Sequence, residues 1–159
     1  MRVAVIGAGL MGHALALVFA LGGHEVRLTD NKPMALKNAR GLMEKALATL
    51  REAGEVDAAW TDDRLHAAVS RYASLADTVR EAELIVEAID ENPEMKRELY
   101  AELDHLAPMD AIIASNTSLV CWTRSATRYS ASASKTTTRP RPLADFGASA
   151  ISRRRRHTA

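Results

Sequence analysis

The sequence predicts an α/β fold with a doubly wound parallel sheet, and three observations support this prediction. Over about the first 115 residues, short apolar segments alternate with longer segments whose apolar residues recur at helical spacing. The apolar segments contain few polar residues, as expected of strands buried on both faces of a parallel sheet. A glycine-rich turn directly follows the first of them. Alternating strands and helices of this kind form an open sheet with right-handed crossovers and helices on both faces.

Five strands are expected, and the second and third are separated by an unusually long segment. The strand segments are residues 2–6, 25–29, 72–73, 84–89 and 111–114. The helical segments are residues 14–21, 33–52, 61–69, 74–82 and 93–106. About 40 residues therefore separate the second strand from the third, which leaves room for two helices where one is usual.

The glycine-rich turn reads GxGxxG and is made of Gly7, Ala8, Gly9, Leu10, Met11 and Gly12. In this pattern Gly7 permits the tight turn from strand to helix, and Gly9 lets the backbone approach a pyrophosphate. Gly12 allows the helix to pack closely on the strand. The helix N-terminus offers free N–H groups and positive dipole to phosphates, so the turn predicts a dinucleotide site.

Asp30 closes the second strand, 18 positions after Gly12. An acid at this position accepts hydrogen bonds from an adenosine ribose. Its carboxylate would repel the 2′-phosphate of NADP, and neighbouring Asn31 offers no cation, so we expect NAD. Lys32 is the nearby cation that argues for NADP instead. The alternative is a glycine-rich turn that binds nothing.

Two further polar motifs follow the carboxyl ends of later strands. Asp90-Glu91-Asn92 follows the fourth strand, and Ser115-Asn116-Thr117-Ser118 follows the fifth. Ligands of open parallel sheets bind outside the carboxyl ends of the strands, where Gly7 and Asp30 also lie. The four features therefore point to a single crevice.

With these motifs together, residues 1–118 resemble the NAD-binding domain of the 3-hydroxyacyl-CoA dehydrogenase family, which includes bacterial 3-hydroxybutyryl-CoA dehydrogenases. The resemblance rests on VAVIGAGLMGHALALVFALGGHEVRLTD, the long insertion, ELIVEAIDENPEMKRELYAELD and AIIASNTS. It implies a Rossmann-type fold and the reversible, NAD-dependent oxidation of an L-3-hydroxyacyl-CoA to a 3-ketoacyl-CoA. It also implies an acyl-CoA substrate and, for full-length members, a homodimer.

The resemblance adds residues to the predicted cofactor site. Glu91 and Lys96 match positions that contact the cofactor near its nicotinamide, and Ser118 matches a serine beside the nicotinamide and the 3-oxygen of the substrate. From the residues alone, Glu91 is an acid at a helix start and Lys96 lies on a solvated helix face. The predicted cofactor-binding residues are Gly7, Ala8, Gly9, Leu10, Met11, Gly12, Asp30, Glu91, Lys96 and Ser118. No catalytic and no metal-binding residue is assigned.

The segment after Ser118 departs from the family pattern. It has no HFFNP-like segment with the catalytic histidine, no partner glutamate and no helical domain. Residues 1–122 carry 12 Lys and Arg and 19 Asp and Glu, whereas residues 123–159 carry 9 and 1. We expect residues 1–118 to form an NAD-binding domain truncated before its last strands. We expect residues 119–159 to be disordered, because so polar and basic a segment buries little apolar surface.

Two explanations of this basic segment lead to different functions. A shift of reading frame after Ser118 is favoured, since the change falls inside a motif; the chain is then an inactive piece of a 3-hydroxyacyl-CoA dehydrogenase. The alternative is a non-catalytic dinucleotide-binding module whose basic tail binds nucleic acid. The single cysteine, Cys121, and the lack of any apolar run of about 20 residues indicate a cytoplasmic protein that does not span a membrane.

Overall fold

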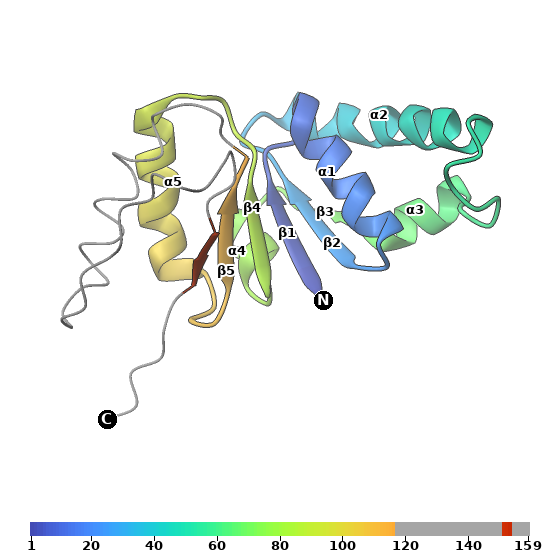
Figure 1. Cartoon of the computed structure of the whole chain (residues 1–159). Helices are drawn as coiled ribbons and strands as arrows, with labels where there is room; N and C mark the ends of the chain where they lie inside the picture. Colours follow the sequence, from blue (N-terminus) through green and yellow to red (C-terminus); the bar gives the residue numbers. More distant parts are fainter. Residues whose placement is uncertain (117–150, 154–159) are drawn as a thin grey trace, which may run out of the picture.

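The computed structural model describes residues 1–116 and 151–153, which form one sheet covered by helices on both faces (Figure 1). The strands are β1 (Arg2–Ile6), β2 (Glu25–Thr29), β3 (Val69–Arg71), β4 (Leu84–Glu87), β5 (Ile112–Ser115) and β6 (Ile151–Arg153). Their order in the sheet is β3-β2-β1-β4-β5-β6. The first five strands are parallel, and β6 runs antiparallel to β5. This is the predicted doubly wound, Rossmann-type fold.

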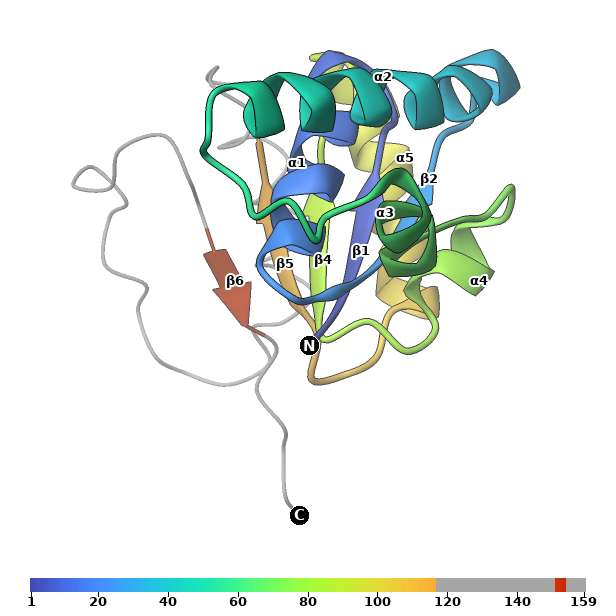
Figure 2. The ribbon, with the colours of Figure 1, turned by 90° about the vertical axis from the view of Figure 1, so that its right-hand side faces the viewer.

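Helices divide between the two faces of the sheet. They are α1 (Leu10–Leu21), α2 (Pro33–Glu52), α3 (Asp62–Ala68), α4 (Leu75–Val79) and α5 (Pro93–Leu106). The first three pack on one face, and α4 and α5 pack on the other (Figure 2). Within the described residues, no helix is both long and apolar enough to cross a bilayer.

Alternate residues of β1 supply the two halves of the core. Val3 and Val5 face α1 and α2, while Ala4 and Ile6 face α4 and α5. All four side chains are buried, and burial of each valine or isoleucine contributes about 1.5–3 kcal/mol. The central strand is therefore held on both sides, and its carboxyl end is a rigid base for the turn that follows.

The register brings the carboxyl ends of three strands to one edge. Ile6 at the end of β1 is paired with Thr29 of β2 and with Glu87 of β4. The winding reverses between β1 and β4, since β2 and β3 lie to one side and β4 and β5 to the other. Such a reversal opens a crevice at the carboxyl edge.

The long insertion contains the two expected helices, but the third strand begins earlier than expected. Helix α3 ends at Ala68, and β3 covers Val69–Arg71, so the prediction of a strand at residues 72–73 was wrong. Val69 was expected to continue the helix because it lies four residues after Leu65. Pairing with Val26 of β2 assigns it to the sheet instead.

Within residues 119–159 the structure describes only Ile151–Arg153. These residues pair with the edge of β5, with Ile151 opposite Ala114, and disorder of residues 119–159 stays a prediction. An open strand edge offers unpaired N–H and C=O groups to any extended segment, which is the physical basis of the pairing. The other residues of 119–159 lie outside the part that the structure describes.

The ion pair between Arg27 of β2 and Glu81 leads to a testable pH effect. The Nη2 atom of Arg27 donates a hydrogen bond of 2.6 Å to Oε2 of Glu81, and this bond holds the pKa of Glu81 below its ordinary value of 4.5. A carboxyl group whose pKa is lowered on folding adds stability above its unfolded pKa, and this stability is lost as the pH falls through the folded pKa.

Glu81→Gln is therefore expected to lower the melting temperature at pH 7 and to have a smaller effect at about pH 3. Thermal unfolding followed by circular dichroism at both pH values tests this. Glu25→Gln is the control, because Glu25 lies 3.5 Å from the same guanidinium and should have the smaller effect. An equal loss at both pH values would contradict the assignment.

Candidate cofactor site

The glycine-rich turn is held by contacts that only glycine allows at two of its positions. Gly7 has a φ of +103°, and a Cβ there would lie 2.4 Å from the carbonyl oxygen of Ala88. A Cβ on Gly12 would lie 1.7 Å from the carbonyl oxygen of Gly7. Both glycines are therefore required by the protein itself, because α1 and the β4–α5 loop lie against the turn.

Gly9 differs from both of these glycines. A Cβ on Gly9 would meet no protein atom within 4 Å, and its φ of −72° is open to any residue. No protein contact among the described residues explains a glycine here. Gly9 is also the N-cap of α1, so no side chain caps the helix, and the following Leu10 and Met11 are 83% and 48% exposed. Open space before an uncapped helix N-terminus fits an anionic group of a ligand.

Asp30 lies beside this turn, as the sequence predicts. Its Oδ2 accepts a hydrogen bond of 2.6 Å from the backbone N–H of Ala8, and its Oδ1 accepts one of 2.7 Å from the N–H of Lys32. The carboxylate thus ties the glycine-rich turn to the end of β2. A carboxylate offers about four acceptor positions, so the two that remain are available to ribose hydroxyls.

An exposed ion pair joins the loop after β2 to the loop after β4. The Nζ atom of Lys32 donates to Oδ2 of Asp90 at 2.8 Å, and the two side chains are 62% and 68% exposed. This hydrogen bond raises the pKa of Lys32 and lowers that of Asp90. In this conformation the ammonium of Lys32 has an acidic partner, which weakens the argument that it would attract the 2′-phosphate of NADP.

A second set of polar groups is buried between β4, β5 and α5. Glu87, at the end of β4, is fully buried, and its Oε1 accepts from Nζ of Lys96 at 2.6 Å and from the N–H of Ile89 at 3.0 Å. Its Oε2 accepts from the hydroxyl of Ser115 at 2.6 Å and from that of Tyr100 at 3.2 Å. The four side chains Glu87, Lys96, Tyr100 and Ser115, here called the Glu87 cluster, connect β4, β5 and α5.

Of the three remaining predicted residues, one is exposed, one is buried and one lies outside the described part of the chain. Glu91 is exposed in the β4–α5 loop at the crevice. Lys96 is only 1% exposed, so the interpretation of a solvated helix face was wrong. Contact of Lys96 with the cofactor stays a prediction, and it would require the ammonium to leave Glu87. Ser118 lies outside the described residues.

Sequence reasoning missed Glu87 as a site residue. The available signal was an acid inside the apolar strand segment LIVEAI, since a buried carboxylate needs partners. Lys96 and Tyr100, which follow it by 9 and 13 positions, are the fourth and eighth residues of α5 and supply two of those partners. Only the packing of α5 against β4 brings them together.

Comparison with protein families matches residues 2–137 to the family described as 3-hydroxyacyl-CoA dehydrogenase, NAD binding domain. The chain belongs to this family, and its cofactor is NAD. The match extends beyond Ser118, where the recognisable motifs end.

Individual relatives agree with the family. A probable 3-hydroxybutyryl-CoA dehydrogenase of Deinococcus radiodurans is 36% identical over 129 residues, which are 80% of this chain and 45% of that protein. A lambda-crystallin homolog of Rattus norvegicus is 31% identical over 116 residues, 73% of this chain and 36% of the relative. The solved 3-hydroxybutyryl-CoA dehydrogenase of Escherichia coli K12 superposes with a TM-score of 0.68 at 32% identity, covering 76% of this chain and 25% of that one. This chain thus spans less than half the length of these relatives.

Proposed function

We propose that the chain is the NAD-binding part of an oxidoreductase that interconverts L-3-hydroxyacyl-CoA and 3-ketoacyl-CoA. The observation that carries the proposal is the open space at Gly9, between the uncapped N-terminus of α1 and the carboxylate of Asp30. The turn and helix would hold the pyrophosphate, and Asp30 would hold the adenosine ribose. NAD, when bound, supplies the hydride acceptor.

Calorimetric titration of the full chain with NAD and with NADP tests the proposal. We expect saturable binding of NAD and binding of NADP that is weaker by about tenfold or more, because Asp30 repels a 2′-phosphate. Failure to bind NAD, with the fold intact by circular dichroism, would overturn the proposal.

Asp30→Asn is expected to lower the affinity for NAD about tenfold and to reduce the preference for NAD over NADP. The amide oxygen still accepts from the N–H of Ala8, so the turn stays in place while the negative charge is lost. Asp57→Asn is the matched control. Asp57 also accepts a backbone N–H two residues later, at 2.7 Å, but it follows the far end of α2. Equal effects of the two changes would argue against a role in binding the ribose.

We further propose that this chain alone turns over acyl-CoA substrates negligibly. The oxidation needs a base to take the hydroxyl proton. A histidine paired with a carboxylate is a candidate for this base. Among residues 1–116, His66 has such a partner, since its Nε2–H donates to Glu44 at 2.7 Å. Its Nδ1 already accepts from Nη2 of Arg40 at 2.7 Å, so no free lone pair is left to act as a base. Normal rates with acetoacetyl-CoA and NADH would refute the proposal.

A further inference from the structure

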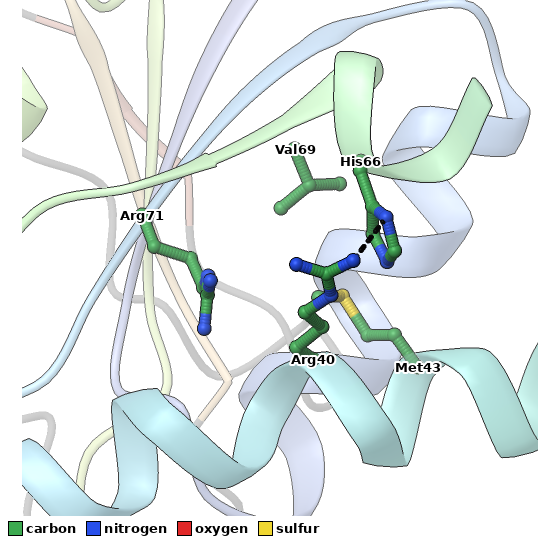
Figure 3. A pocket seen from close by; sticks show the side chains of 5 residues that line it. All are labelled: Arg40, Met43, His66, Val69 and Arg71. Carbon is green, nitrogen blue, oxygen red and sulfur yellow. Dashed lines mark hydrogen bonds between the residues drawn. The ribbon is translucent and has the colours of Figure 1, made fainter. Parts of the chain in front are cut away.

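A cavity of about 210 Å³ lies between α2, α3 and the end of β3, and its lining residues are Arg40, Met43, His66, Val69 and Arg71. In Figure 3 the side chains of Arg40 from α2 and of Arg71 from β3 reach into the same space. Arg71 is the last residue of β3 and is paired with Leu28, two residues before Asp30. The cavity therefore opens near the carboxyl edge of the sheet, next to the strand that ends in Asp30, and it uses none of the residues of the cofactor site.

The cationic groups of this cavity are only partly neutralised. Glu44 is the nearby acid, and its Oε1 accepts from Nε of Arg40 at 3.1 Å and from Nε2–H of His66. The bond from Arg40 holds the pKa of Glu44 below its ordinary value, so Glu44 is ionised near neutral pH. Nδ1 of His66 faces Nη2 of Arg40, so His66 adds no negative charge to the cavity. Two guanidinium groups and one carboxylate leave the cavity with a net positive charge.

Donors remain free on both arginines. Within the described part of the chain, Nη1 of Arg40 makes no hydrogen bond, and the guanidinium of Arg71 makes no hydrogen bond and no ion pair. The rest of the lining is apolar at Met43 and Val69, which are both buried. An apolar wall with unpaired guanidinium donors at its mouth suits a ligand that has an anionic end.

The size of the cavity limits what it holds. Pockets for complete drug-sized ligands measure about 300–1,000 Å³, so a volume of about 210 Å³ accommodates one end of a nucleotide and not a whole one. A phosphate monoester carries a charge of about −1.5 to −2 near neutral pH and three acceptor oxygens, which matches two guanidinium groups better than a single carboxylate does.

We propose that Arg40 and Arg71 form a binding site for the phosphate monoester of a ribose-linked nucleotide. Two common ligands carry this group: coenzyme A as its 3′-phosphate and NADP as its 2′-phosphate. In the first case the site extends the proposed acyl-CoA function; in the second it is a separate nucleotide site.

The test compares ligands that differ only in this phosphate. The full chain is titrated by calorimetry with coenzyme A against dephospho-coenzyme A and with NADP against NAD, and inorganic phosphate is used as the minimal probe. We expect one of two gains: coenzyme A binds about tenfold more tightly than dephospho-coenzyme A, or NADP binds at a second saturable site that NAD does not occupy. The first gain assigns coenzyme A as the source, and the second assigns NADP, whose affinity at the cofactor site stays lower than that of NAD.

Arg71→Gln is expected to remove this gain without lowering the melting temperature, since the Arg71 side chain makes no hydrogen bond or ion pair within the described part of the chain. Arg80→Gln is the matched control, because Arg80 is exposed before β4, at the opposite edge of the sheet. No gain in either pair, or an equal loss in both variants, would overturn the site. Binding of unphosphorylated NAD to the same samples reports on the proposed function independently.

Discussion

Gly9→Ala is expected to weaken NAD binding about tenfold or more while the melting temperature changes little. The added methyl group meets no protein atom within 4 Å, and the backbone at Gly9 is extended with a negative φ. The change stabilises by about 0.4–1 kcal/mol through the unfolded state, but alanine is a poorer N-cap than glycine, so the two effects oppose each other. The methyl group would occupy the space through which the pyrophosphate approaches the backbone. Calorimetry with NAD and thermal unfolding of the same samples measure both effects.

Gly12→Ala provides the contrast. Its methyl group would lie 1.7 Å from the carbonyl oxygen of Gly7, so α1 must move away from β1, and a lower melting temperature is expected. Binding would then be lost together with stability. If Gly9→Ala lowered the melting temperature as much as Gly12→Ala, or if it bound NAD normally, Gly9 would not be where the cofactor approaches.

Local signals in the sequence were sufficient for most of the fold. Helix α2 covers Pro33–Glu52 as predicted, because a proline marks its start and its apolar stripe continues over five turns. Thr61 and Ser74, the first residues of two predicted helical segments, cap α3 and α4 through their side chains. In each case, residues within one helix turn determine the boundary.

Features that depend on distant contacts could not be predicted. Val69 suits both the apolar stripe of α3 and a strand, and only its pairing with Val26 decides between them. The sequence shows Lys96 as one of several charged residues of a helix, and only the position of Glu87 explains its burial. The turn at Gly7 was recognisable because its GxGxxG pattern consists of residues that are adjacent in the sequence, whereas the Glu87 cluster joins three separate elements.

Breaking the Glu87 cluster is expected to have the largest effect on stability. Glu87 and Lys96 are 0% and 1% exposed and lie 2.6 Å apart. Lys96→Met would leave a buried carboxylate with only neutral donors, and Glu87→Gln would leave a buried ammonium without its counter-charge. Loss of one partner of such a pair costs about 3–5 kcal/mol. This is a large part of the stability of about 5–15 kcal/mol that is usual for a domain. Urea unfolding of both variants gives the free energies.

The double variant Glu87→Gln/Lys96→Met separates the charge from the packing. It removes both charges, so its loss of stability should be smaller than the sum of the two single losses, with a coupling of at least about 1 kcal/mol. Lys32→Met is the control, because Lys32 and Asp90 lie 2.8 Å apart but are exposed, and such pairs contribute about 0–1 kcal/mol. Similar losses for Lys96→Met and Lys32→Met would show that burial does not set the strength of these pairs. Additive single losses would show that Glu87 and Lys96 stabilise the fold through separate contacts, with Ser115 and Tyr100 holding the carboxylate on their own.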